Sequence, residues 1–120
     1  MNPTDWEARS SMGERRDCTV RALVALSGRD YGTVYKVFAD HGRKKGEGVF
    51  LRKIIHSVGA ALDLKFRNVK RGGSLEKLIR RYPTGKLAVT IRHHAFAVID
   101  GKISDDSRPG SHVKMAWLVV

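Results

Sequence analysis

Cys18, the only cysteine among the 120 residues, is the side chain whose chemistry most needs an explanation. Asp17 precedes it as a good N-cap, whose carboxylate can accept from free N–H groups of the next turn, and the apolar run of residues 20–26 predicts a helix ending near Gly28. A thiol in the first turn feels the positive end of the helix dipole, which favours the nucleophilic thiolate. A single cysteine is nevertheless more often a small buried apolar side chain. A catalytic role therefore requires a base elsewhere in the chain.

His94 and Asp105 can supply that base and the group that orients it. The pair Asp100-Gly101 between β-forming residues predicts a hairpin in which Phe96 lies opposite Asp105. Because side chains alternate along a strand, His94 shares the face of Phe96, and Asp105 lies diagonally next to it. Asp105 can then accept from one ring nitrogen of His94 while the other nitrogen faces a thiol. The sequence predicts a Cys18, His94 and Asp105 triad, although a sheet histidine and a strand-end carboxylate are each ordinary when taken singly.

Zinc binding is an alternative use of the histidines. It would combine His93 or His94 with His112 and an aspartate, but these residues have no recognisable zinc-ligand spacing. The triad itself needs no metal or organic group, so we expect no cofactor.

The order of the elements predicts how these residues are positioned. Helical periodicity and caps predict helices over residues 18–27, 30–41, 51–59 and 74–81, and alternating or β-branched runs predict strands over residues 62–66, 86–92, 94–99, 102–105 and 113–120. Helices followed by an antiparallel meander indicate an α+β fold.

Length and composition predict one domain. A chain of 120 residues with 42% hydrophobic residues suits a single core, which we assign to residues 14–120. Residues 1–13 are polar apart from Trp6 and Met12 and are expected to be a flexible, loosely attached arm. The sequence has no apolar leader and no run of about 18 apolar residues, so we expect a cytoplasmic protein without a membrane partner.

The charge of the chain points to acidic partners. Lys and Arg number 23 against 12 Asp and Glu, which gives a net charge of +11. Such a field attracts nucleic acid or an acidic protein, yet the basic residues are spread along the chain without a zinc-finger, RNA-recognition or Walker motif. A solvated basic surface and a true polyanion site both remain open.

The triad order resembles that of the papain-like cysteine peptidase superfamily: a cysteine opening a helix, a histidine opening a strand, and a carboxylate on the next strand. Residues 17–23 resemble the nucleophile helix of ovarian-tumour-type deubiquitinases, and residues 94–98 resemble the histidine strand of papain-like and bacteriocin-processing peptidases. The hairpin followed by residues 113–120, with Trp117, is similar to small papain-like proteins of phages and bacteria. The resemblance covers residues 14–120. It implies N-terminal helices, with the nucleophile helix central, packed on a C-terminal antiparallel sheet, in the cytoplasm of a bacterium or a phage-infected cell.

The chain departs from that superfamily at the oxyanion site. Papain-like enzymes often use an upstream glutamine or asparagine as a donor, whereas this chain has no glutamine, and Asn2 is its only asparagine before Cys18. The donors would have to come from the Cys18 backbone N–H and its neighbours, Arg16 and Asp17 being the adjacent residues. Loss of one such donor typically costs about 10²–10³ in kcat.

Two classes of function follow. The first is a small thiol hydrolase that cleaves an amide or isopeptide bond of a protein or peptide, with Cys18 as nucleophile; deamidation and acyl transfer would use the same residues. The alternative is a catalytically weak or inactive papain-like module whose basic surface binds nucleic acid or an acidic protein.

Overall fold

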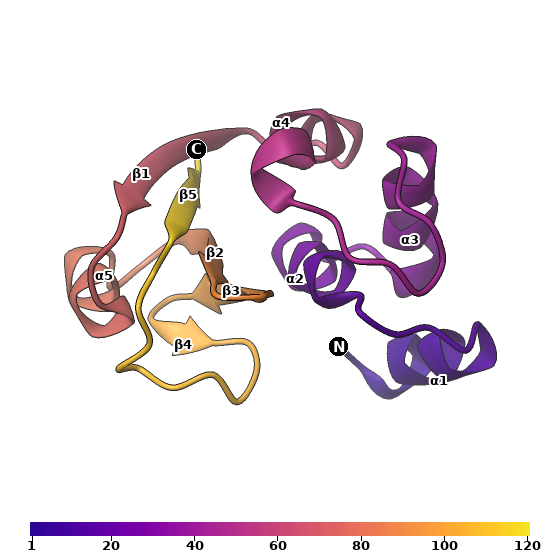
Figure 1. The fold of residues 1–120 in the computed structure, drawn as a ribbon, viewed down its shortest axis with the longest axis horizontal. Helices are drawn as coiled ribbons and strands as arrows, with labels where there is room; N and C mark the ends of the chain where they lie inside the picture. The colour runs from indigo at the N-terminus through magenta and orange to yellow at the C-terminus, as the bar shows by residue number, and fades with distance from the viewer.

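The helical and the strand-forming parts of the sequence form separate layers of the fold. The computed structural model describes residues 1–69 and 72–120 in full, and residues 70 and 71 only by their place in a strand. The described chain has the helices α1 (Pro3–Ser11), α2 (Cys18–Ser27), α3 (Tyr31–Asp40), α4 (Leu51–Ala61) and α5 (Leu75–Arg81). Its strands are β1 (Phe66–Arg71), β2 (Lys86–Ile91), β3 (His94–Ile99), β4 (Lys102–Ile103) and β5 (Met115–Val119). They form one antiparallel sheet in the order β1-β5-β2-β3-β4 (Figure 1), which confirms the predicted α+β class.

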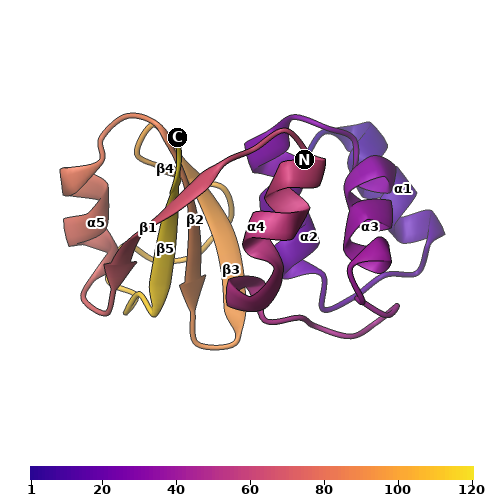
Figure 2. The same ribbon diagram turned by 90° about the horizontal axis from the view of Figure 1, so that it is seen from above.

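Alternating residues of each strand point to opposite sides of the sheet. Both faces are buried, because helices pack on each of them. The face toward α5 carries larger side chains, among them Leu87, Val89, Phe96 and Val98, which pack with Leu75 and Leu78. The other face carries Ala88, Ala95, Ala97 and Trp117, which pack with residues of α2, α3 and α4. Small alanines let a helix approach the sheet closely, and α2 makes the main helix contact with β3. Figure 2 shows α5 on one side of the sheet and the other helices on the opposite side.

Several predicted caps and turns are confirmed. The Asp30 carboxylate accepts from the Thr33 N–H at 2.7 Å at the start of α3, and Ser74 caps α5 in the same way. Gly28 ends α2 with a φ of 68°, and its N–H bonds to Val24 O at 3.0 Å. Asp100 and Gly101 both have positive φ and form the turn between β3 and β4, as the two central residues of a type I′ hairpin require.

The first strand differs from the prediction. Residues 62–66 were expected to form it, but α4 continues to Ala61 and β1 begins only at Phe66. Gly59 does not end the helix; an added Cβ there would lie 2.7 Å from a ring carbon of Phe66, so glycine allows the close approach of helix and strand. Pairing of β1 with β5, in which Phe66 lies opposite Val119, sets the register. The helix end and the strand start are therefore decided by a distant part of the chain.

The N-terminal residues also differ from the prediction. Instead of a flexible arm, residues 3–11 form α1, which packs against α3. Asn2 caps the helix by accepting from the Asp5 N–H at 2.8 Å. Asp5 is buried, and its carboxylate accepts from the Tyr31 N–H at 2.9 Å. Two polar residues of this segment, Asp5 and Arg9, are thus hydrogen-bonded to the body, at Tyr31 and Asp17. None of the described helices combines the length and apolar character needed to cross a membrane.

Substitution of Asp5 tests this anchoring. Asp5→Ala leaves the N–H of Tyr31 without its acceptor, so we expect the free energy of unfolding in urea to fall by about 1–3 kcal/mol. The matched control is Glu7→Ala, an exposed acidic residue on the same helix, expected to change it by about 0.5 kcal/mol or less. Equal effects of the two substitutions would show that α1 is not anchored through Asp5.

Candidate active site

Cys18 is the first residue of α2 and His94 is the first residue of β3. Because α2 packs along β3, the starts of the two elements meet at one end of their contact. The first backbone hydrogen bond of α2 runs from the Arg21 N–H to Asp17 O, so helix geometry leaves the N–H groups of residues 18–20 outside the helix ladder. The thiol is therefore placed beside free backbone donors and an imidazole.

The His94 ring lies between Cys18 and Asp105. Its Nε2 is 2.5 Å from Oδ2 of Asp105, which leaves Nδ1 as the nitrogen available to the thiol. Asp105 is itself held in place, because its Oδ1 accepts from the Ser107 N–H at 2.8 Å. The hairpin register is the predicted one, with Val98 opposite Ile103 and Ile99 opposite Lys102. The prediction that Asp105 lies next to His94 is thereby confirmed, although β4 ends at Ile103, before Asp105.

The electrostatics of the pair favour its charged form. Burial raises the pKa of the Cys18 thiol, but hydrogen bonds from His94 and from the Ala95 N–H, with the charges of His94 and Arg21, outweigh burial and lower the pKa. The hydrogen bond with Cys18, opposed by burial and assisted by Asp105, raises the pKa of His94 to about 9. A lowered pKa of the thiol together with a raised pKa of the imidazole favours the thiolate and imidazolium forms, as an activated cysteine nucleophile requires.

Asp17 has a different role from the predicted one. It occupies the N-cap position of α2, but its side chain makes no capping hydrogen bond. The fully buried carboxylate instead accepts from Arg9 at 2.7 and 2.9 Å, from the Tyr31 hydroxyl at 2.7 Å and from Arg21 at 3.2 Å. Burial raises the pKa of Asp17, but the hydrogen bonds from Arg9 and Tyr31 prevail and lower it. Asp17 therefore joins α1, α3 and the start of α2 instead of capping the helix with its side chain.

A second buried carboxylate fixes the loop that approaches the cysteine. Glu14 accepts from Arg43 at 3.0 and 3.2 Å, from the Arg15 N–H at 2.9 Å and from the Gly46 N–H at 2.8 Å. Arg43 also donates to Arg15 O at 3.1 Å. These bonds hold residues 43–48 against the segment before Cys18, where Arg16 has a left-handed backbone with φ of 51°. Such strained conformations persist only where surrounding contacts enforce them.

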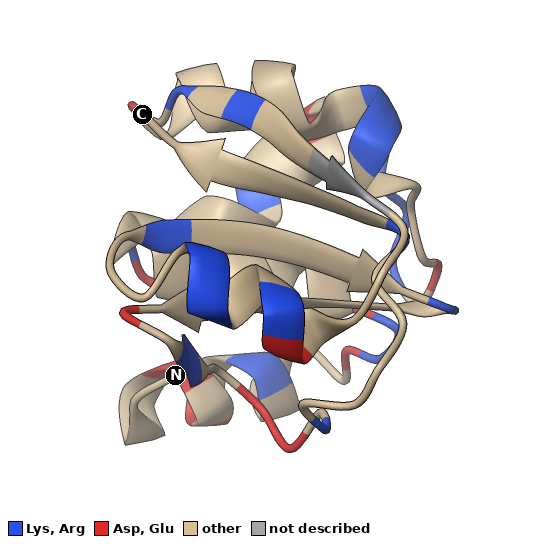
Figure 3. Cartoon of the chain, turned by 90° about the vertical axis from the view of Figure 1, so that its left-hand side faces the viewer, with Lys and Arg blue, Asp and Glu red and all other residues tan. Residues whose placement is uncertain are grey.

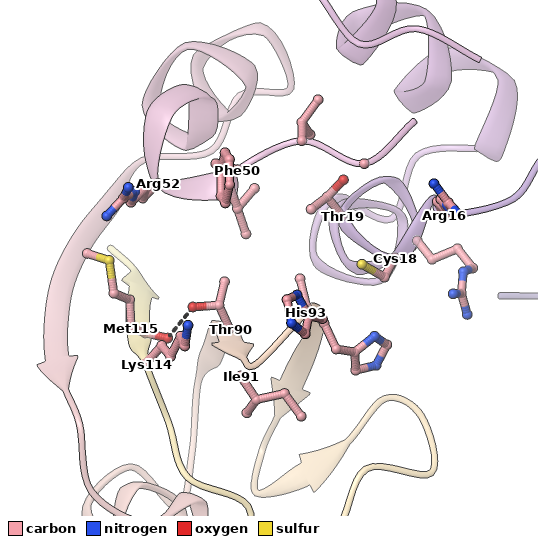
Figure 4. Close-up of a pocket in the computed structure, with 16 residues that line it drawn as sticks. Arg16, Cys18, Thr19, Phe50, Arg52, Thr90, Ile91, His93, Lys114 and Met115 are labelled. Atoms are coloured by element: carbon pink, nitrogen blue, oxygen red, sulfur yellow. Dashed lines mark hydrogen bonds between the residues drawn. The ribbon is translucent and has the colours of Figure 1, made fainter. Parts of the chain in front are cut away.

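Two hollows flank Cys18. The larger, of about 1010 Å³, is lined by His94 and lies between the start of α4, the end of β2 and the start of β5. Figure 4 shows the Cys18 sulfur directed into it, with Phe50 and Arg52 on one wall and Thr90, Lys114 and Met115 on the other. The smaller, of about 280 Å³, lies on the side of Trp6 and Asp105. A chain laid across both hollows would pass over the thiol.

The predicted site residues therefore fall into two groups. Cys18, His94 and Asp105 are brought together, and Arg16 lines the larger hollow with Cys18, whereas Asp17 lines neither hollow. The sequence analysis missed Glu14, Arg43 and the loop before α4. An acid, an arginine and glycines separated by about 30 residues carry no local pattern that predicts such pairing.

The zinc alternative lacks a ligand set. Among the described residues, no group of three or more His, Cys, Asp or Glu side chains is arranged to hold a metal ion. His112 lies beside Gly72 and opposite Ser74, and it lines neither hollow.

Comparisons of the chain with models of protein families, with curated proteins and with solved structures find no match in any of the three. The papain-like resemblance of the sequence stays a prediction, and the functional inference rests on the geometry of the site.

Asp105→Asn tests the coupling of the aspartate to the imidazole. Removing the negative charge takes away a cause of the raised pKa, so we expect the titration midpoint of His94 to fall below about 9, followed by NMR of the ring C–H signals. Asp106→Asn, the exposed neighbour, is the matched control and should leave the midpoint unchanged. An unchanged midpoint in Asp105→Asn would contradict the pairing.

The Glu14 cluster predicts a loss of stability in acid. Burial raises the pKa of Glu14, but the hydrogen bonds from Arg43 and from two backbone N–H groups lower it to about 2. A carboxylate with a lowered pKa stabilises the fold above its ordinary value of 4.5, and this contribution is lost as the pH falls toward about 2. The lost contribution is on the order of 3 kcal/mol.

Urea unfolding at several pH values between about 6 and about 2 measures this dependence. Glu14→Gln should be less stable at the upper end and should lose less stability on acidification. Glu47→Gln, an exposed residue of the same loop, should follow the unsubstituted protein. Parallel curves for Glu14→Gln and the unsubstituted protein would exclude the stabilising role of this carboxylate.

Proposed function

We propose that the protein is a small papain-like thiol hydrolase that cleaves an amide or isopeptide bond of a protein or peptide. The observation that carries the proposal is the His94 ring, which is hydrogen-bonded to Asp105 through Nε2 and lies close enough to Cys18 to lower the pKa of its thiol, at the wall of an open cleft. A nucleophile, a base and an orienting carboxylate in this order form the arrangement expected for an activated cysteine. A reactive thiol of this kind stays reduced in the cytoplasm, which is where we place the protein.

The chemistry assigns one step to each group. The Cys18 thiolate attacks the carbonyl carbon, forming the S–C bond, and the carbonyl oxygen becomes an oxyanion near the free N–H groups at the start of α2. The imidazolium of His94 protonates the leaving amine as the C–N bond breaks and a thioester remains. Water then attacks the thioester while His94 takes its proton, the C–S bond breaks, and the acid leaves with the thiolate and imidazolium restored. Asp105 holds the ring in place throughout.

The position of α2 in the fold supports the proposal. The nucleophile helix α2 lies between the sheet and the outer helices α1 and α3, as the papain-like resemblance implies (Figure 2). Deamidation or acyl transfer would use the same thioester, because only the nitrogen group that leaves or the acceptor that enters would differ. These reactions are variants of the same proposed chemistry.

Alkylation of Cys18 by iodoacetamide as a function of pH tests the proposal. We expect an apparent pKa well below the ~8.5 of a free cysteine, raised toward that value by His94→Ala. His93→Ala is the matched control, because His93 lines the same cleft without touching Asp105, and it should leave the apparent pKa nearly unchanged. A thiol that stays inert until the protein unfolds would refute the hydrolase.

A binding role of the basic surface is the second candidate. Lys77, Arg80 and Arg81 are exposed on the outer side of α5, and Arg67 of β1 is exposed as well. Figure 3 shows α5 and β1 on the same side of the molecule. For a protein that neutralises phosphates of duplex DNA, the logarithm of the binding constant falls linearly with the logarithm of the salt concentration, with a slope of about −0.9 for each phosphate contacted. Titration of binding to duplex DNA at several salt concentrations measures the slope, and a slope near zero would remove this role.

A further inference from the structure

The two hollows beside Cys18 differ in charge. The larger carries Arg16, Arg21, Arg52 and Lys114, and none of the described residues that line it is an Asp or Glu. The smaller carries Asp105 and Asp106 together with Trp6, and it shares Arg21 with the larger. A substrate that lies across the thiol therefore meets a cationic wall on one side and a wall with two carboxylates on the other.

Three of the four cations are available for a ligand. Arg16, Arg52 and Lys114 are exposed, and in the part of the chain that the structure describes no carboxylate forms an ion pair with them. Arg21 differs, because its Nε bonds to Asp17 at 3.2 Å. In a cleft with low-dielectric walls, charges of one sign reinforce each other and attract an oppositely charged group.

Phe50 adds an apolar contact to the same wall. Its side chain is 68% exposed at the start of α4, where the Arg52 guanidinium and the Lys53 ammonium lie 5.7 and 5.4 Å from the ring centre. An exposed aromatic ring beside a cation suits a peptide, whose aliphatic atoms can pack on the ring while a carboxylate reaches the cation.

We propose that the cleft selects peptides that carry a carboxylate on the Phe50 side of the reacting bond, recognised by Arg52 and Lys114. This inference rests on the proposed thiol hydrolase and adds its substrate class. Asp105 is bonded to His94, but the exposed Asp106 of the smaller hollow repels an acidic group and so places the acidic residue on the Phe50 side. The carboxylates Asp105 and Asp106 favour a peptide over a nucleic acid, because the phosphates of a nucleic acid that continued past the thiol would meet them.

Alkylation of Cys18 tests the charge of the cleft without requiring turnover. Iodoacetate and iodoacetamide differ in one negative charge, so the ratio of their rates reports the local potential. The rate with iodoacetate divided by the rate with iodoacetamide should fall about ten-fold in the double variant Arg52→Glu/Lys114→Glu. The double variant Lys77→Glu/Arg81→Glu on α5 carries the same change in net charge and is the matched control. At about 0.1 M salt it should leave the ratio unchanged, because distant charges are screened.

Protection of Cys18 from iodoacetamide tests the peptide. A glutamate-rich peptide should slow the alkylation several-fold more than its glutamine counterpart, and the Arg52→Glu/Lys114→Glu variant should lose the difference. Amidated and free-acid forms of the glutamine peptide distinguish a terminal carboxylate from a side-chain carboxylate. Stronger protection by the free acid than by the amide, or by glutamate than by glutamine side chains, supports carboxylate selection.

Three results would overturn the inference. Equal protection by the glutamate peptide and the amidated glutamine peptide would exclude selection of a carboxylate, while a fast, low-pKa thiol would leave the hydrolase intact. Protection by an RNA oligonucleotide but not by the acidic peptide would reassign the cleft to nucleic acid. A thiol inert to both reagents in the folded protein would remove the hydrolase and its substrate class together.

Discussion

The buried carboxylate of Asp17 is the interaction on which the rest of the site depends. It joins Arg9 of α1 and Tyr31 of α3 to the residue that precedes Cys18, with Arg21 on the next turn of α2. A buried charge left without its partner destabilises a protein by about 3–5 kcal/mol, so these groups hold one another in place. The start of α2, and with it the thiol, is fixed by three helices rather than by one cap.

The reactive groups themselves come from element ends that two packing constraints bring together. The alanine-rich face of β3 lets α2 lie close to the sheet, which places Cys18 at the level of His94. The tight Asp100-Gly101 turn then returns the chain so that Asp105 meets the outer nitrogen of His94. A helix start supplies the nucleophile and a hairpin supplies the base with its orienting carboxylate. The segments that line the larger hollow supply basic residues on one side of the thiol, and those that line the smaller hollow supply carboxylates on the other.

Local chemistry made the hairpin half of the site predictable from the sequence. The relation of His94 to Asp105 depends on a two-residue turn and on strand alternation, both of which are readable within twelve residues. Asp17 was misassigned because its partners Arg9 and Tyr31 lie 8 and 14 residues away and outcompete the nearby N–H groups. The start of β1 depends on pairing with β5, which leaves no local pattern. Helix α1 does begin with a local signal, the Asn2 cap followed by Pro3, which the sequence analysis missed, whereas its anchoring through Asp5 to α3 leaves none.

The central claim is that the folded protein holds Cys18 as a thiolate beside a protonated His94. The most direct measurement is the ultraviolet absorbance of the thiolate as a function of pH, with Cys18→Ser as the blank that removes the tyrosine contribution. A midpoint well below ~8.5, with the thiolate present at neutral pH, is the predicted result. A midpoint at or above that value would contradict the ion pair and leave Cys18 as a residue of the packed interior.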